Sequence, residues 1–302
     1  MFLKTLGIFI SLGLVISAAV AGDTDSSPAN LSAAAIVDRN VAARGGLPAW
    51  RAVQTMSFSG KLTAGGNQRA SLPVPMTDRR ASQRSGKMSF PSRPSEEVQL
   101  PFVMDLKRTR KMRMELQFNG QTAIQVFDGA NGWKLRPFLN RREVEPFTTE
   151  ELKASSSQAD LDGFLVDYAA KGTQIELVGR EKVDDRDTYK LKLTMKSGEP
   201  IHVWIDAQTF LEAKIQGQPR RLDGVYHPVE IHYRDYRPVN GLQVPYLIET
   251  EVLPVAQAKA AKAIKAPAIQ AEKIYIETVM VNPKLDDSLF SRPEPGSTPK
   301  VK

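Results

Sequence analysis

The sequence predicts a mainly β protein of the α+β class, built on one strongly curved antiparallel sheet with helices against one face. About ten segments alternate apolar and polar side chains with period two, short turns separate them, and no strand–helix–strand rhythm of a parallel sheet occurs. A sheet of that many strands must curl strongly or close. A curled sheet capped by helices encloses a hollow, and hollows of this kind hold ligands.

The N-terminal residues have the pattern of a secretory signal peptide. Lys4 supplies a positive charge, Leu6 to Val20 is apolar, and Ala19-Val20-Ala21 is a small-x-small cleavage signal. We therefore expect residues 1–21 to be removed during export and the protein to be periplasmic. An uncleaved membrane anchor is the alternative, but the apolar run is shorter than the ~20 residues that a membrane span needs.

The mature chain opens with a predicted helix. After a polar lead, Ser32 can cap a helix that continues to about Arg44, and a Gly-Gly pair then ends it. A further short helical turn follows around Trp50. From Thr55 the hydrophobic period changes to two, which predicts a half-buried strand as far as Leu62.

The stretch MRMELQFNGQTAIQVFDGANGW, residues 112–133, predicts a meander of three strands. Apolar and polar side chains alternate on the first strand, and Asn119-Gly120 then offers the positive φ angles that a type I′ hairpin turn requires. Residues 122–127 form the return strand, and DGANG is the next turn. Asp128 could belong to a catalytic or metal-binding loop, but turn chemistry explains it better.

Helices and further strands follow the meander. Two helices are predicted at residues 148–154 and 160–170, and a glycine ends the second. The remaining strands alternate cleanly, and their turns are rich in Asp, Gly and Pro. These strands are predicted at residues 174–182, 189–196, 201–205, 211–216, 229–236, 246–253 and 273–281.

The predicted elements fit one domain, residues 22–292, because the strands in hairpin order point to a single antiparallel sheet. Residues 67–95, rich in Pro, Ser and Arg, are interpreted as a long loop. Residues 255–270 form an Ala/Lys-rich insertion that is either a basic helix or a solvated loop. Residues 293–302 have the composition of a disordered tail.

Composition excludes several kinds of site. The chain has no cysteine, which excludes thiol catalysis, thiolate metal sites and lipidation of an N-terminal cysteine. His227 and His232 are five residues apart on one strand, so they point to opposite faces and make a poor metal pair. Neither a P-loop nor a G-x-S-x-G motif occurs. We therefore predict that the protein is not an enzyme and uses no cofactor or metal.

The net charge is +7, and cations are concentrated between Arg79 and Arg113. A basic patch favours an anionic partner, and for an exported protein phospholipid head groups are favoured over nucleic acid. The plain alternative is the solvated face of a basic protein. The residues predicted to contact head groups or the membrane are Lys107, Arg108, Arg110, Lys111 and Arg113.

Short segments spread along nearly the whole mature chain follow a family pattern. They are FDGANGW, FLVDYAAKG, IELVGRE, YKLKL, HVWID and the closing NPKLDDSLFSRP, preceded by AARGGLPAWRAVQTMSFSG. These segments resemble the periplasmic lipoprotein-carrier superfamily of LolA, LolB and outer-membrane lipoprotein-sorting proteins. The resemblance implies an incomplete antiparallel β-barrel with helices as a lid over an apolar cavity. Family members shelter lipoprotein acyl chains, carry lipids, or bind segments of other envelope proteins.

The resulting prediction is a monomeric carrier that binds lipid or lipoprotein acyl chains without covalent chemistry, in outer membrane lipoprotein sorting or envelope lipid transport. It would contact the anionic membrane surface or membrane proteins transiently. The alternative is a protein-binding regulator or accessory factor of the same fold, with a partner's peptide in the cavity. We expect the cavity to be lined by Met112, Met114, Leu116, Phe118, Ile124, Val126, Leu191 and Leu193, with lid contacts from Phe164 and Leu165.

Overall fold

The computed structural model describes residues 31–65, 97–137, 141–222, 224–255 and 271–294. The predicted signal peptide, the loop at 67–95, and nearly all of the 255–270 insertion and the 293–302 tail lie outside the described residues.

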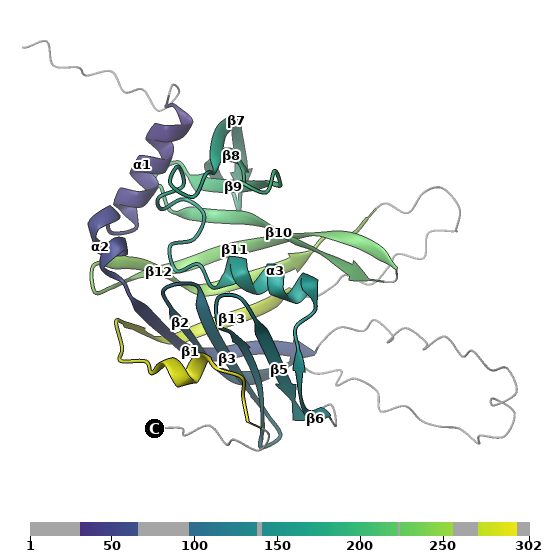
Figure 1. The fold of residues 1–302 in the computed structure, drawn as a ribbon. Coiled ribbons are helices and arrows are strands. Elements are labelled where there is room, and N and C mark those ends of the chain that lie inside the picture. The colour runs from purple at the N-terminus through teal and green to yellow at the C-terminus, as the bar shows by residue number, and fades with distance from the viewer. Residues whose placement is uncertain (1–30, 66–96, 138–140, 223, 256–270, 295–302) are drawn as a thin grey trace, which may run out of the picture. The chain divides into compact units, whose positions relative to one another are not determined.

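The described residues form one antiparallel sheet of thirteen strands (Figure 1). The strand order is β6-β5-β4-β3-β2-β1-β13-β12-β11-β10-β9-β8-β7, and the two end strands do not pair, so the sheet is curved but unclosed. The predicted curved antiparallel sheet is confirmed, although β6 was not predicted. The strands are β1 (Thr55–Gly65), β2 (Glu97–Lys107), β3 (Lys111–Phe118), β4 (Gln121–Phe127), β5 (Gly132–Arg136), β6 (Arg141–Pro146), β7 (Gln174–Val183), β8 (Arg186–Thr194), β9 (Pro200–Asp206), β10 (Glu212–Leu222), β11 (Val225–Val239), β12 (Leu242–Val252) and β13 (Glu272–Val281).

The pairing of β1 with β13 joins two meanders, one from each half of the chain. The register shifts between Ser59 and Gly60, which marks a β-bulge, and bulges bend a strand and increase its twist. A Cβ atom added at Gly60 would lie 1.9 Å from the backbone oxygen of Tyr275. Glycine therefore permits the close strand approach on which the curvature of the sheet depends.

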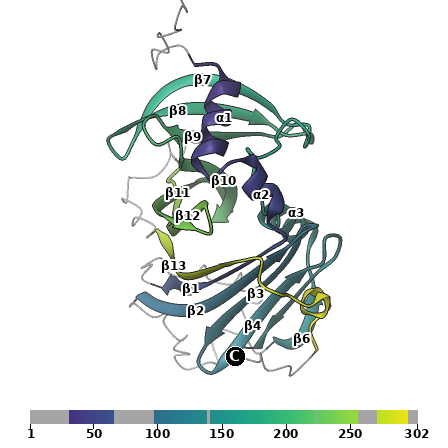
Figure 2. The ribbon, with the colours of Figure 1, turned by 90° about the vertical axis from the view of Figure 1, so that its left-hand side faces the viewer.

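Helices cover one face of the sheet, called the inner face below (Figure 2). Ser32 accepts a hydrogen bond from the backbone of the first helical turn, and Thr148 and Glu151 form a capping box, so both predicted helix starts are confirmed. The helices are α1 (Ala33–Ala43), α2 (Leu47–Ala52) and α3 (Thr149–Gln158).

The second helix predicted after the meander, at residues 160–170, is wrong. These residues form a series of turns instead. Gly163 and Asp167 have φ angles of 68° and 53°, which interrupt a right-handed helix. The apolar spacing that suggested a helix has another use, because Leu161, Leu165 and Val166 are buried within the turns.

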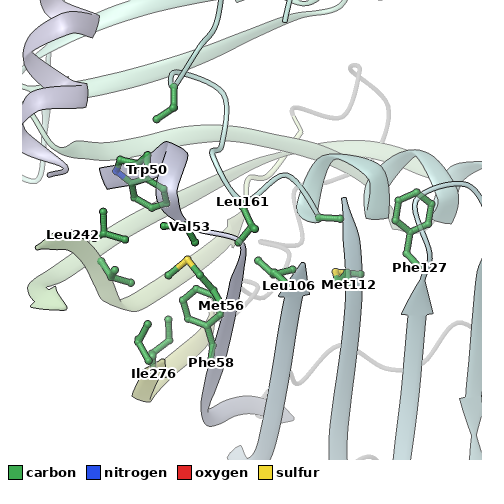
Figure 3. Close-up of a cluster of buried hydrophobic side chains, with 14 of the residues drawn as sticks. Trp50, Val53, Met56, Phe58, Leu106, Met112, Phe127, Leu161, Leu242 and Ile276 are labelled. Carbon is green, nitrogen blue, oxygen red and sulfur yellow. The ribbon is translucent and has the colours of Figure 1, made fainter. Parts of the chain in front are cut away.

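The main core lies between the inner face and these covering segments (Figure 3). Trp50 and Val53 at α2 and Leu161 from the turns pack against Met56 and Leu106 of the sheet. A smaller cluster occupies the opposite face, called the outer face. There Phe290, in the 3₁₀ helix Asp287–Phe290 (η3), packs against side chains of β4 and β5.

Candidate functional site

The inner face carries apolar side chains in rows that cross several strands. Met56, Leu106, Met112 and Phe127 are direct cross-strand neighbours on β1 to β4, and all four are buried. Directly paired residues of an antiparallel sheet share one face, so this row is a continuous apolar floor. The predicted cavity residue Met112 is only 1% exposed, and it therefore belongs to the core as the structure stands.

Farther along β1 to β3, and on the neighbouring strands β13 and β12, the inner face is only partly covered. The side chains there pack on the main core but keep some exposed surface. They extend over five neighbouring strands, which corresponds to about 19 Å at ~4.8 Å per strand. We call this set the inner apolar strip, and it consists of Leu62, Met104, Met114, Leu116, Ile248 and Ile274.

The sequence prediction and the strip overlap at Met114 and Leu116. The other four members were missed, although their strands show the same alternation. Leu62 pairs with Ile274, and Ile274 pairs with Ile248, through long-range contacts of β1, β13 and β12. Alternation tells which residues of one strand share a face, but it does not tell which strands are neighbours.

The placement of Ile124 and Val126 beside Met112 is wrong. In the register of β3 and β4, Ile124 pairs with Glu115 and Val126 with Arg113, which alternate with Met112 and so point to the outer face. Both side chains are buried there with Phe290. The misassignment arose because β4 is apolar on both faces, so its pattern does not indicate which face is the inner one.

Three of the predicted cavity residues are packed in the core and do not line a cavity: Leu165, Leu191 and Leu193. Both β8 leucines have 0% exposure, and Leu165 is buried as well, so in this conformation they offer no surface to a ligand. Phe164 and Phe118 are partly buried.

A contact of α1 explains the burial on β8. Tyr189, two residues before Leu191, stacks on Phe210, and the Phe210 backbone carbonyl accepts a 2.8 Å hydrogen bond from Asn40 of α1. Because residues two apart on a strand share a face, the β8 leucines lie on the side that α1 covers.

The predicted head-group cations all have partners within the chain. Arg108 forms a bidentate pair with Asp162 at 2.7 and 2.6 Å and donates to the Trp50 carbonyl, and the hydrogen bonds that it donates to the Asp162 carboxylate raise the pKa of the guanidinium. Arg110 lies 3.5 Å from Asp160. Around them is a pocket of about 200 Å³, lined by Arg108, Thr109, Arg110, Ala159, Asp160, Leu161, Asp162 and Lys171.

The C-terminal segment binds the other three cations. Lys107 and Lys111 lie 3.2 and 2.8 Å from Asp287, and Arg113 donates to the Leu289 carbonyl while pairing with Glu115. These contacts hold η3 on the outer face. Head-group contact by the Lys107–Arg113 run thus stays a prediction, and the cations would have to exchange their present partners to make it.

One end of the inner apolar strip carries a polar cluster. Tyr233 is the direct cross-strand neighbour of Ile248. Nearby, Arg44 and Glu212 form a 3.2 Å ion pair, and Tyr236 donates a 3.0 Å hydrogen bond to the Glu212 carbonyl. Burial, together with the charge of Glu212, raises the pKa of Tyr233 to about 12. Its hydroxyl therefore stays protonated to a higher pH than that of an ordinary tyrosine.

The loop at Asp128 is a turn, as the sequence indicated. Its carboxylate accepts hydrogen bonds from the backbones of Ala130 and Asn131 at 2.8 and 2.7 Å. Burial alone would raise the pKa of Asp128, but these hydrogen bonds outweigh it and lower the pKa. The acid is held charged to close the turn.

Within the described part of the chain, His, Asp and Glu side chains do not gather into a group that could hold a metal ion. In that same part, the helices are too short or too polar to cross a membrane.

The fold and inner face define a class: an unclosed, curved antiparallel sheet whose helix-covered face is apolar. The unclosed sheet with helices over one face agrees with the fold implied by the resemblance to LolA and LolB, so the predicted LolA-like fold is confirmed, while the apolar cavity stays a prediction.

Comparison with known proteins agrees with this class at the level of fold. Neither a family model nor a curated protein matches the sequence. Among solved structures, a DUF1329 family protein from Desulfovibrio piger matches with a TM-score of 0.50 and 13% identity, over 87% of this chain and 98% of that one. A LolA superfamily protein from Nitrosomonas europaea matches with a TM-score of 0.49 and 13% identity, over the same shares. At such identity the likeness concerns the fold alone.

Proposed function

We propose that the protein is a periplasmic carrier that binds a lipid or the acyl chains of a lipoprotein on its inner face, without covalent chemistry. The observation that carries the proposal is the inner apolar strip, a partly exposed run of six apolar side chains under helices. Cleavage of residues 1–21, a single domain at residues 22–292, a monomeric state, and a role in outer membrane lipoprotein sorting or envelope lipid transport belong to the same proposal.

The size of the strip suits an acyl chain. Each methylene removed from water contributes about 0.8 kcal/mol, so ten methylenes against the strip contribute roughly 8 kcal/mol as an upper value. That free energy corresponds to a dissociation constant in the micromolar range. Met104 and Met114 are unbranched and polarizable, so they adapt to chains of different shape. Affinity of this order permits both capture and release.

The test compares two arginine variants on adjacent strands. Leu116→Arg places a charge in the strip, whereas Val103→Arg places one on the outer face, because Val103 pairs with Glu115. Val103 is already 37% exposed, which makes its variant a matched control. We expect Leu116→Arg to lower affinity for a fluorescent fatty-acid probe at least tenfold and Val103→Arg to leave it unchanged. Equal affinity in both variants would place the ligand elsewhere or exclude it.

Native mass spectrometry of gently purified protein identifies the natural occupant. A co-purified lipid mass supports the carrier, and its loss in Leu116→Arg but not in Val103→Arg assigns it to the strip. A clean mass, together with a protein captured only by the chain with an intact strip, would favour the alternative, a regulator that binds a partner's peptide.

A further inference from the structure

The long hairpin of β10 and β11 extends beyond both of its neighbours in the sheet. β9 pairs with β10 only as far as Ile215, and β12 pairs with β11 only from Val229 onward. Past those points, residues 220–222 pair with residues 225–227. At the base of this stretch, Arg220 also pairs with Glu272 of β13, and Nδ1 of His227 lies 2.9 Å from the Leu253 carbonyl oxygen. We call residues 220–222 and 224–227 the β10–β11 tip.

The two faces of this tip differ in chemistry. Leu222 pairs directly with Val225, which makes the end of one face apolar. Arg221 pairs with Tyr226, and its guanidinium carbon lies 6.0 Å from the tyrosine ring centroid, which gives an aromatic and cationic face. Successive residues of a strand point to opposite faces, so Val225 and Tyr226 lie on different sides of the ribbon.

The end of the tip is exposed on both faces, whereas at its base His227 is buried and Arg220 pairs with Glu272 of β13. Val225 is 46% exposed and Tyr226 is 60% exposed. Elsewhere among the described residues, large exposed apolar side chains such as Val178 and Met280 occur singly. A two-stranded ribbon is marginally stable in water by itself, so exposing adjacent apolar side chains on it has no structural benefit.

The chemistry of the tip fits a phospholipid bilayer better than a protein. A protein partner would cover one face of the ribbon, whereas the interfacial layer of a membrane surrounds an inserted tip and contacts both faces. Tyrosine with an apolar neighbour is typical of that layer, since its ring is apolar and its hydroxyl is polar. Arg221 donates within the tip, to the Gly224 carbonyl at 3.4 Å, and its exposed guanidinium can also meet lipid phosphate.

We propose that the β10–β11 tip is the membrane-docking element of the protein, inserted into the head-group region of an anionic phospholipid bilayer. Val225 and Tyr226 contact the apolar boundary of that region, and Arg221 contacts phosphate. The inference rests on the proposed carrier function and adds the surface through which the carrier meets a membrane. On this proposal the tip makes the membrane contact, and the Lys107–Arg113 run, which is paired within the chain, does not.

Vesicle co-sedimentation tests the proposal with the full mature chain. The vesicles contain phosphatidylglycerol and phosphatidylcholine in equal parts. The tip variant is Val225→Ser with Tyr226→Ser, and the control is Val178→Ser with Met280→Ser, at side chains with 51% and 50% exposure. We expect the tip variant to lose about tenfold or more in vesicle affinity, because most of the insertable apolar area is gone, and the control to match the parent protein. Arg221→Glu should weaken binding to these vesicles more than binding to pure phosphatidylcholine.

Fatty-acid probe binding without vesicles separates this inference from the proposed function. A tip variant that binds probe but not vesicles supports docking at the tip. Vesicle binding by the tip variant at the parent's level would overturn the inference, as would a parent protein that ignores vesicles but is cross-linked through position 226 to a protein. A parent that binds vesicles through the tip but binds no probe leaves docking intact and refutes the carrier function.

Discussion

The ammonium group of Lys134 lies 2.6 Å from each carboxylate oxygen of Glu151, and this ion pair fastens α3 to β5. Lys134 is the cross-strand neighbour of Gln125, which is in turn the neighbour of Met114 in the inner apolar strip. Glu151 also completes the capping box of α3. One carboxylate thus both starts the helix and holds it over the inner face.

Replacing Lys134 with methionine should loosen α3. Lys134 is 7% exposed, while the Glu151 side chain is more exposed. The loss of unfolding free energy should therefore lie between the values for surface and for buried ion pairs, at about 1–2 kcal/mol. Amide hydrogen exchange should speed up more in α3 than in the other helices and strands. Lys153→Met is the control on the same helix, because its pair with Glu199 is exposed. Equal effects of both variants would contradict the role of the buried ion pair.

Acid should release α3 for the same reason. Burial raises the pKa of Glu151, but the hydrogen bonds from Lys134 and Thr148 outweigh it and lower the pKa below its usual 4.5. A lowered folded-state pKa gives stability above pH 4.5 that is lost as the pH falls through the folded value. Hydrogen exchange of α3 as a function of pH measures this. Glu151→Gln should flatten the dependence below pH 4.5, and an unchanged profile would assign the acid response to another group.

Gly132 should tolerate no side chain. Its Cβ would lie 2.0 Å from the ring of Phe147, which leads into α3. Gly132→Ala should therefore cost about 1–3 kcal/mol of unfolding free energy through overpacking. The double variant Gly132→Ala with Phe147→Ala provides the check. Because the clash is removed, its loss should be smaller than the sum of the single losses, and strict additivity would show that the two positions do not interact.

How far the sequence predicts the fold depends on how each strand is buried. β3 has one apolar face, and its alternation placed Met114 and Leu116 correctly on the inner face. β4 is apolar on both faces, so Ile124 and Val126 were assigned to the wrong one. The turn at Asn119-Gly120 was readable because its φ angles of 49° and 72° require those residue types.

The candidate site was less predictable because it depends on long-range pairing. Leu62, Ile274 and Ile248 become neighbours only when β1 meets β13 and β13 meets β12. Likewise, the pairing of Lys107 and Lys111 could not be predicted, because their partner Asp287 is far away in sequence. Local patterns predict which face a side chain takes, but charge pairing and strand order are set by tertiary contacts.

Tyr233, at the end of the inner apolar strip, should make the protein sensitive to alkali. Its pKa is raised from 10.0 to about 12, by burial first and by Glu212 second. A raised folded-state pKa gives stability that is complete below pH 10 and lost as the pH rises toward 12, about 2–3 kcal/mol in full. Tyr233→Phe removes the ionisable group and keeps the ring. Urea unfolding at pH 9 and pH 11 should therefore show a smaller decrease in Tyr233→Phe than in the parent protein. Equal decreases in unfolding free energy for the two proteins would mean that ionisation of Tyr233 does not destabilise the fold. Its end of the strip would then be open to water.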